Sequence, residues 1–311
     1  KSNEVLMLAY MNEDAFNNTL APGISINETM ANKSITWEKT TQVDLGVDAD
    51  LWQGKLGVTI DYFNKKTNDI LLELPTPEML GVKPPMQNAG SVVNRGVELL
   101  LTHRNQVNDF RYSASFNFSY VHNEITDLKG ADQPGRSVGD PVNNIYGYVF
   151  DKIFESQEEI DNSPKQIWGA VPGDLKYKDL NGDNVIDDKD RTSIGSDFPS
   201  INYGLRLEMG YKQFDFSALF QGAADVKAIV RGEIGKAFLN GGKVTNKHLD
   251  RWTPNNLSAT YPRLTIKDAT RNNYESTFWT QNASYLKMRN LQVGYTLDKN
   301  LIGKAGLSRL R

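Results

Sequence analysis

A stretch of twelve residues past the middle of the sequence, DLNGDNVIDDKD at 179–190, carries an oxygen-bearing side chain at almost every second position. Calcium is a hard cation that takes about 6–8 oxygen ligands, and a twelve-residue loop can supply them from its odd-numbered side chains, one backbone carbonyl and a closing acid. The spacing therefore predicts a structural calcium site, in which position seven contributes its carbonyl oxygen and the other positions contribute side-chain oxygens. The predicted ligands are Asp179, Asn181, Asp183, Val185, Asp187 and Asp190.

Two positions of this segment depart from the EF-hand pattern. Position six is Asn184 where Gly is usual, and position twelve is Asp190 where a bidentate Glu is usual. Asn tolerates a positive φ, so the sharp turn is still possible. The segment resembles the shorter dockerin-type calcium loops, which close on Asp and need no flanking EF-hand helices. The alternative is an acidic turn without metal, because Asn-Gly-Asp-Asn favours a turn by itself.

The composition excludes several classes of function. The chain has 35 basic and 38 acidic residues among 311, a net charge of −3, which gives no electrostatic reason to expect a nucleic-acid partner. It has no cysteine, so disulfides, thiolate zinc sites and thiol nucleophiles are excluded. The three histidines stand singly, without the spacing of metal ligands, and we expect them to be exposed or core residues. They are His103, His122 and His248.

The beginning of the sequence predicts a piece of a longer protein. The first ten residues, KSNEVLMLAY, do not form a signal peptide, and the chain lacks an initiator Met. No apolar run approaches the ~20 residues that a membrane helix needs. We therefore expect a fragment rather than a complete mature protein.

Apolar and polar residues alternate along several segments, which is the period of β-strands with one apolar face. In 110–122, for example, Phe116 and Phe118 share one face while Arg111 and Ser115 share the other. A further strand at 284–297 has a less regular phase, which indicates a β-bulge. The other strands form three predicted hairpins, 43–51 with 56–63, 94–103 with 110–122, and 202–211 with 214–222.

Short turns and long connections alternate along these strands. The turns at 53–55, 105–109 and 212–213 are short, whereas about eighty residues, 123–200, separate the second hairpin from the third. Loops beyond ~15 residues are uncommon in compact soluble domains. Outer-membrane barrels, in contrast, combine short periplasmic turns with long extracellular loops. The pattern predicts an all-β fold, an antiparallel transmembrane β-barrel with lipid outside and a polar lumen inside.

Aromatic residues near the strand ends and charged residues within the strands are consistent with a barrel but do not require one. Aromatic residues near strand ends can form a girdle at the lipid headgroups, although ordinary β-propensity also accounts for each of them. These aromatic residues are Trp52, Phe110, Tyr120, Tyr203 and Tyr211. Charged residues at the polar phase of the strands are expected to face the lumen, or solvent if the protein is soluble. They are Asp61, Glu98, Arg206 and Glu208.

Six segments spread over nearly the whole chain can be compared with a known family. They are ITWEKTTQVDLGVD at 35–48, DYFNKKTNDILL at 61–72, NAGSVVNRGVELLL at 88–101, PGDLKYKDLNGDNVIDDKDRTSIGS at 172–196, PSINYGLRLE at 199–208 and NASYLKMRNLQVGYTL at 282–297. In this order they resemble the C-terminal part of the barrel of SusC/RagA-type TonB-dependent transporters, outer-membrane nutrient importers of Bacteroidetes-type bacteria. That family most often has Gly where this chain has Asn184.

The resemblance implies a 22-stranded barrel filled by a plug domain, with a SusD-like lipoprotein over its extracellular mouth and the TonB-ExbB-ExbD system acting from the periplasm. Residues 1–311 are then a C-terminal portion of the barrel, without the plug, the TonB box or the last strands. Residues 123–200 become a long extracellular loop that contains the calcium-like segment. Val185 and Ile186 are expected to anchor that segment against the barrel wall.

Two functions from different classes follow. The resemblance implies energy-coupled import of oligosaccharides or peptides across the outer membrane, with no catalysis. The alternative is a soluble secreted glycan-binding or carbohydrate-active β-protein with a dockerin-like calcium loop. A glycosidase needs two carboxyl groups about 5–10 Å apart on facing elements. The adjacent acids at 158–159 and 187–188 provide no such pair, so no catalytic residue is predicted.

Three loop tryptophans also allow two interpretations. They can stack on sugars, or they can be buried in a small core of the loops. They are Trp168, Trp252 and Trp279.

Overall fold

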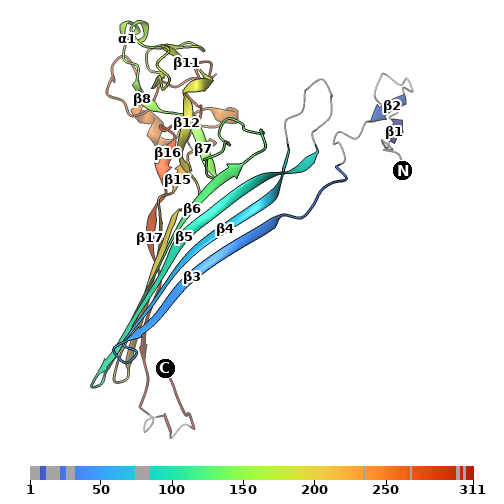
Figure 1. Cartoon of the computed structure of the whole chain (residues 1–311). Helices are drawn as coiled ribbons and strands as arrows, with labels where there is room; N and C mark the ends of the chain where they lie inside the picture. The colour runs from blue at the N-terminus through green and yellow to red at the C-terminus, as the bar shows by residue number, and fades with distance from the viewer. Residues whose placement is uncertain are drawn as a thin grey trace.

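The computed structural model describes residues 8–11, 22–25, 32–73, 85–233, 235–266, 268–298, 302–303 and 306–311. Its largest unit is a seven-stranded antiparallel sheet with the strand order β17-β14-β13-β6-β5-β4-β3 (Figure 1). The strands of this sheet are β3 (Lys39–Leu51), β4 (Leu56–Glu73), β5 (Met86–Val107), β6 (Phe110–Asp127), β13 (Ile201–Tyr211), β14 (Phe214–Ala224) and β17 (Tyr285–Tyr295).

The remaining elements are small. The other strands pair in twos: β1 (Leu8–Met11) with β2 (Pro22–Ser25), β8 (Phe150–Ile153) with β10 (Leu175–Tyr177), β9 (Lys165–Gln166) with β11 (Val185–Ile186), β7 (Asn144–Tyr148) with β12 (Arg191–Ser196), and β15 (Lys227–Ile229) with β16 (Thr280–Asn282). The helices are α1 (Gln157–Asp161) and the 3-10 helices η2 (Asp188–Asp190), η3 (Leu239–Gly241) and η4 (Asn246–Asp250). Among the described residues, no helix has the length and hydropathy to span a membrane.

The register of the sheet confirms the predicted alternation. Val47 lies opposite Ile60, Ile60 opposite Leu99, and Leu99 opposite Phe118, so that apolar residues form continuous rows across the strands. Side chains of one phase point to one face of a sheet. The apolar face is largely exposed, and its exposed members include Val43, Leu45, Val47, Ile60, Tyr62, Leu286, Leu291 and Val293.

The opposite face of the sheet is polar. Asp61 lies opposite Glu98, and Glu98 lies opposite Ser119. On β13, Arg206 Nε donates a hydrogen bond to Glu208 Oε1 at 3.0 Å, and both side chains have the same phase as the serines of β6. The four charged residues that were expected to face a lumen therefore do share one face.

Aromatic rings line the short-turn end of the apolar face. Tyr211 lies opposite both Phe110 and Phe214, and Phe214 lies opposite Tyr295, with a distance of 4.8 Å between those last two ring centroids. All four rings are exposed. This row is the arrangement that an aromatic girdle requires.

All three short turns lie at the same end of the sheet (Figure 1). The turns at 52–55 and 212–213 agree with the prediction. The predicted turn at 105–109 was too long, because β5 continues to Val107 and β6 begins at Phe110. The polar run there is paired in the ladder, and only 108–109 are left for the turn, where Asn108 has a φ of 52°.

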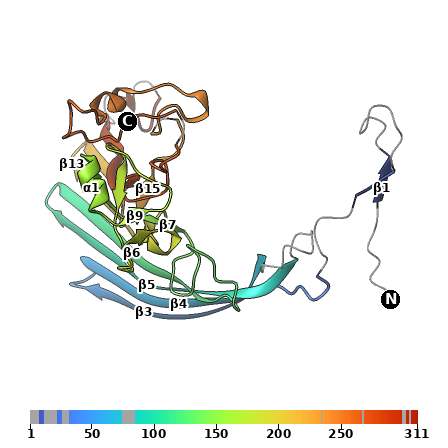
Figure 2. The ribbon, with the colours of Figure 1, turned by 90° about the horizontal axis from the view of Figure 1, so that it is seen from above.

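The long connections 128–200 and 225–284 lie together at the other end of the sheet (Figure 1). We call their described residues the loop module. The predicted start of the first connection at 123 was early, because β6 continues to Asp127. Ile125 of β6 packs with Leu128 and Ala131, which places the start of the module on the polar side of the sheet. Seen from above, the sheet is an arc and the module lies over its concave side (Figure 2).

The predicted irregularity of the last strand is also confirmed. The ladder between β14 and β17 shifts its register between Leu219 and Phe220, where Leu219 faces Asn290 and Phe220 faces Met288. Arg289 is thus the extra residue of a β-bulge, and it changes the phase of the strand.

Candidate functional site

The calcium-like segment forms a tight turn held by its own side chains. The two carboxylate oxygens of Asp179 accept hydrogen bonds from the backbone N–H groups of Gly182 (2.7 Å) and Asn184 (2.8 Å). The side-chain oxygen of Asn181 accepts a hydrogen bond from the N–H of Asp183 at 2.9 Å. Asn184 has a φ of 63°, so position six makes the left-handed turn expected of it.

The end of the segment is folded back onto its start. Asp190 is fully buried, and its carboxylate accepts hydrogen bonds from the N–H groups of Leu180 (2.9 Å) and Asp187 (2.8 Å). The carboxylate of Asp187 in turn accepts one from the N–H of Lys189 at 2.7 Å, at the start of η2. The first and last positions of the segment are therefore adjacent, as they are in a loop that surrounds one ion.

Hydrogen bonding keeps Asp179 ionised. Desolvation raises the pKa of its carboxyl, but hydrogen bonds from the backbone N–H groups of Asn184 and Gly182 and the contact with Asp190 lower that pKa below its ordinary value of 3.8. The segment thus presents an anionic carboxylate beside a second carboxyl group.

The donor chemistry of the predicted ligands fits a hard cation, since they offer four carboxylates, one amide and a backbone carbonyl. In the described part of the chain, however, no three His, Asp or Glu side chains are grouped so that they could hold a metal ion. The carboxylates bind backbone N–H groups instead, as Asp183 does with the N–H of Val185 at 2.9 Å. These hydrogen bonds also suit an acidic turn, and calcium binding remains a prediction.

Ile186 anchors the segment to the core of the loop module, and not to the wall of the sheet as expected. It is fully buried in a cluster with Tyr148 and Tyr177, while β11 pairs in parallel with β9. Val185 is only partly buried. The hydroxyl of Tyr148 also donates a hydrogen bond to Asp188 at 3.2 Å. The expectation was wrong because the long connection builds its own hydrophobic core.

The three loop tryptophans belong to this core region, so burial in a loop core is the correct interpretation. Trp168 and Trp252 pack against the cluster, and the ring of Trp168 lies edge-on to Tyr148 at 5.5 Å between centroids. Trp279 is 4% exposed, and its indole N–H donates to the backbone oxygen of Asn272 at 2.8 Å.

Asp174 joins the two halves of the loop module, and the sequence pattern did not single it out. Its carboxylate is fully buried and accepts hydrogen bonds from Arg263 Nε (2.6 Å), Asn272 Nδ2 (2.8 Å) and the N–H of Val171 (2.8 Å). Asp174 follows Pro172 and Gly173, and such residues favour a turn, but they give no sign of a buried ion pair. Its partners are 89 and 98 residues away, and no local pattern reveals such pairs.

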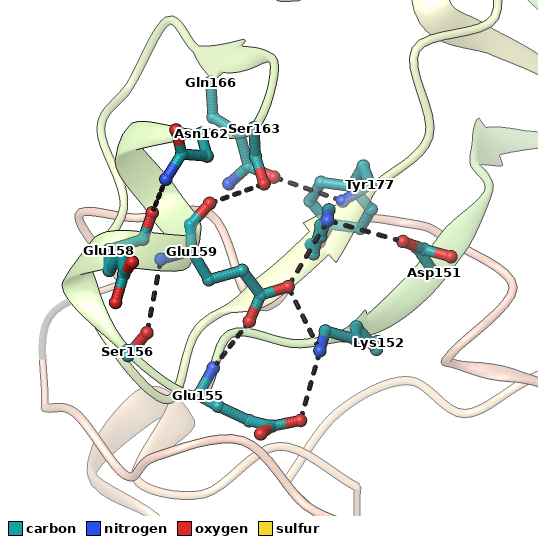
Figure 3. A network of polar contacts seen from close by, with 11 residues as sticks. Asp151, Lys152, Glu155, Ser156, Glu158, Glu159, Asn162, Ser163, Gln166 and Tyr177 are labelled. Carbon is teal, nitrogen blue, oxygen red and sulfur yellow. Dashed lines mark hydrogen bonds and ion pairs between the residues drawn. The ribbon is translucent and has the colours of Figure 1, made fainter.

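Glu159 ties α1 to the small strands of the module (Figure 3). Its carboxylate forms ion pairs with Lys152 (3.2 Å) and Lys176 (3.3 Å) and accepts a hydrogen bond from the N–H of Glu155 at 3.1 Å. Desolvation raises the pKa of Glu159, but these three partners lower it more. Glu159 therefore has a structural role within the loop module.

A cavity of about 610 Å³ lies where the loop module meets the polar face of the sheet. We call it the mouth cavity. Side chains of β4, β5 and β6 form one wall, and side chains of the module form the other. The polar lining residues include Thr67, Asn94 and Asn123 from the sheet and Asn143, Ser193 and Ser196 from the module.

The sequence model of the family described as TonB dependent receptor-like, beta-barrel, matches residues 10–311. The chain belongs to this family. A seven-stranded antiparallel sheet with short turns at one end and long connections at the other is part of such a barrel. The predicted fold class is confirmed.

Individual relatives agree with this assignment. The chain is 29% identical over 299 residues to TonB-dependent receptor P3 of Formosa agariphila, covering 90% of the chain and 29% of the relative. It is also 29% identical over 282 residues to TonB-dependent receptor SusC of Bacteroides thetaiotaomicron, covering 86% of the chain and 27% of the relative. The structure of the RagAB peptide transporter matches with a TM-score of 0.72 and 26% identity. The match covers 96% of the present chain and 33% of the transporter chain.

These matches confirm the resemblance to SusC/RagA-type receptors. The chain spans about a third or less of the length of these relatives. What the whole protein imports and which partners it uses are therefore matters for proposal.

Proposed function

We propose that this chain is part of an outer-membrane importer that uses TonB to take up oligosaccharides or peptides. The observation that carries the proposal is the sheet itself, whose apolar face is exposed and whose opposite face is polar and meets the loop module at the long-connection end. Strands of an outer-membrane barrel need this division between lipid and a polar interior. The named relatives include a receptor called SusC and a peptide transporter, which supports import as the activity.

The alternative, a soluble secreted β-protein, has less support. A β-sandwich would bury the apolar face against a second sheet. Here the described strands form one large sheet, and its apolar residues such as Leu45 and Val47 are 67% and 66% exposed. We therefore propose transport without bond making or breaking.

We also propose that a SusD-like lipoprotein caps the loop module. The support is the family resemblance together with the size and position of the module at the long-connection end of the sheet (Figure 1). TonB with ExbB and ExbD would act on the whole protein from the opposite side.

A structural calcium ion in the segment 179–190 is the third part of the proposal. The adjacency of Asp179 and Asp190 and the left-handed Asn184 support it. The ion would offset the repulsion between neighbouring carboxylates. It would also stabilise a long connection whose ordering costs about 1–2 kcal/mol of conformational entropy per backbone residue.

Deletion of the whole gene in the native organism tests the import function. The expected result is a loss of growth on one class of oligosaccharide or peptide, restored by the intact gene. Growth that is unchanged on every such nutrient would contradict import.

A further inference from the structure

We infer that the apolar face of the sheet carries a binding site for the phosphate group of an anionic membrane lipid. The site consists of Lys66 on β4 and Arg95 on β5, toward the long-connection end of the sheet. The inference rests on the proposed outer-membrane function and goes beyond it, because it assigns a ligand to the face opposite the loop module.

Two aromatic rows mark the edges of the area that lipid would cover. The first is the row near the short turns, which includes Phe110. The second lies toward the long-connection end, where Tyr62 is opposite Val97 and Val97 is opposite Tyr120. Phe110 and Tyr120 are ten residues apart on β6, which is about 34 Å of strand. At a strand tilt of about 35–45°, the rows differ in height by about 24–28 Å, close to the ~25 Å apolar band of outer-membrane barrels. The second row therefore lies where lipid headgroups begin.

The residues just beyond the second aromatic row are mostly polar. On the same face, Asn64 lies opposite Arg95, and Arg95 lies opposite His122. One row further on, Lys66 lies opposite Val93. Lys66 and Arg95 are therefore diagonal neighbours on adjacent strands, about 7–8 Å apart, a distance that long side chains can span. A phosphate group between them would contact both cations.

The positive charge of this site is not cancelled by its neighbours. Lys66 and Arg95 are both exposed, and Lys66 has no hydrogen-bond or ion-pair partner among the described residues. Arg95 Nη2 lies 3.5 Å from Glu124 Oε2, and His122 Nε2 lies 3.3 Å from the same oxygen. Glu124 thus balances the charge of Arg95 and leaves that of Lys66. No hydrogen bond to another described residue occupies the guanidinium of Arg95, so its planar N–H groups can bind two phosphate oxygens.

The surroundings of the site suit a lipid better than a soluble anion. Side chains of this phase point away from the polar face, so a solute that moves along the polar face does not meet them. Toward the short turns, the exposed Val97 and Ile60 continue the apolar face and can contact the acyl chains of the same lipid. The exposed rings of Tyr62 and Tyr120 lie between the chains and the headgroup, as tyrosines do at membrane interfaces.

The test uses the whole protein, purified in detergent, and three probes. Phosphatidylglycerol is the anionic lipid, diacylglycerol with the same chains is the lipid without phosphate, and inorganic phosphate is the free anion. Native mass spectrometry gives Kd for the first bound lipid, and heat-modifiable gel migration shows that each variant is folded. We expect phosphatidylglycerol to bind about tenfold more tightly than diacylglycerol or better, as charge-assisted contacts allow. Millimolar inorganic phosphate should not displace it.

Two variants remove one cation each and leave the apolar surface unchanged. We expect Lys66→Gln and Arg95→Gln each to raise the Kd of phosphatidylglycerol by about tenfold, the effect of losing one charge-assisted contact. The Kd of diacylglycerol should stay the same. Lys65→Gln is the matched control, because Lys65 is an exposed neighbour on β4 whose side chain has the phase of the polar face. It should bind as the wild type does.

Four results would overturn the inference. Equal Kd of phosphatidylglycerol for the wild type, Lys66→Gln and Arg95→Gln would place lipid binding elsewhere. Equal binding of diacylglycerol and phosphatidylglycerol would leave only contact with the apolar surface. Displacement by inorganic phosphate would indicate a site for free anions, and an equal loss in Lys65→Gln would indicate a general effect of charge. The growth phenotype of the deletion strain judges the import function separately.

Discussion

Asp174 and Arg263 form a buried ion pair between the two long connections, with 2.6 Å between Arg263 Nε and Asp174 Oδ1. The backbone reinforces it, since the N–H of Arg263 also donates to the oxygen of Gly173 at 2.8 Å. Gly173 has a φ of 92°, and a Cβ there would clash with the ring of Trp252. The turn at Gly173, the ion pair and the packing of Trp252 therefore depend on one another.

Substituting Asp174 by Ala should loosen the whole loop module. Removing one partner of a buried ion pair leaves the other charge uncompensated, which typically costs about 3–5 kcal/mol. We expect faster proteolysis within 128–200 and 225–284, with the sheet unaffected. The control is Glu275→Gln at the exposed pair of Arg231 and Glu275, which should change little. Equal protease resistance of Asp174→Ala and the wild type would contradict the role of the pair.

The position of α1 should depend on pH through Glu159. The pKa of Glu159 in the folded protein is lowered, so its stabilising effect is present above the ordinary Glu value of 4.5 and is lost as the pH falls through the folded pKa. A spin label on Glu158→Cys, on the exposed side of α1, should gain mobility below about pH 4.5. With Glu159→Gln in addition, mobility should be high already at neutral pH. In the Glu158→Cys variant that retains Glu159, a label mobility that does not change with pH would refute the dependence of α1 on the charge of Glu159.

Calcium should protect the first long connection from protease. The carboxylates of Asp179 and Asp183 accept hydrogen bonds from backbone N–H groups and from the amide of Asn181, and Asp179 also contacts Asp190. A bound cation would neutralise these carboxylates. We expect slower cleavage in 128–200 with millimolar calcium than with chelator, and the weak affinity of extracellular modules, at about 10⁻⁴–10⁻³ M. Asp179→Ala and Asp183→Ala should remove the difference. If calcium and chelator give the same cleavage in the wild type, the segment is an acidic turn without metal.

An introduced charge should destabilise the protein on the apolar face of the sheet much more than on the polar face. Leu99 and Leu100 are neighbours on β5 that point to opposite faces, Leu99 to the apolar face and Leu100 to the polar one. Leu99→Arg should lower the stability of the membrane-inserted protein by about 2–4 kcal/mol, the cost of Arg near the bilayer midplane. Leu100→Arg should have a small effect. Urea titration of heat-modifiable migration in lipid measures both, and equal losses would argue against the assignment of the faces.

The sheet could be predicted from the sequence because each strand shows its apolar face locally. The period of two along 110–122 and the short turns predicted the hairpins. The uneven phase of 284–297 predicted a bulge, which the structure places at Arg289. Strand ends were less accurate, since polar residues such as Asn105 continue the ladder where the pattern indicates a turn. The hydrogen bonds of a ladder do not depend on side-chain polarity.

The loop module could not be predicted in the same way. Its stability depends on contacts between residues far apart in sequence, such as Leu175 with Asn272 and Asp174 with Arg263, and no periodic pattern records them. The turn chemistry of 179–184 was visible because Asp179 bonds residues close to it. The burial of Ile186 in the core of the module was not visible, because it depends on Tyr148 and Tyr177.

The topology of the chain in the outer membrane is the central claim, and labelling of cysteines in whole cells tests it most directly. The chain has no cysteine of its own, so single substitutions give an unambiguous signal from this region. Asn108→Cys and Lys212→Cys lie in the short turns, and Lys129→Cys and Asn255→Cys lie in the loop module. An impermeant thiol reagent should label the two module positions in intact cells, and should label the two turn positions only after the outer membrane is opened. Labelling of the turns but not of the module in intact cells would contradict the account.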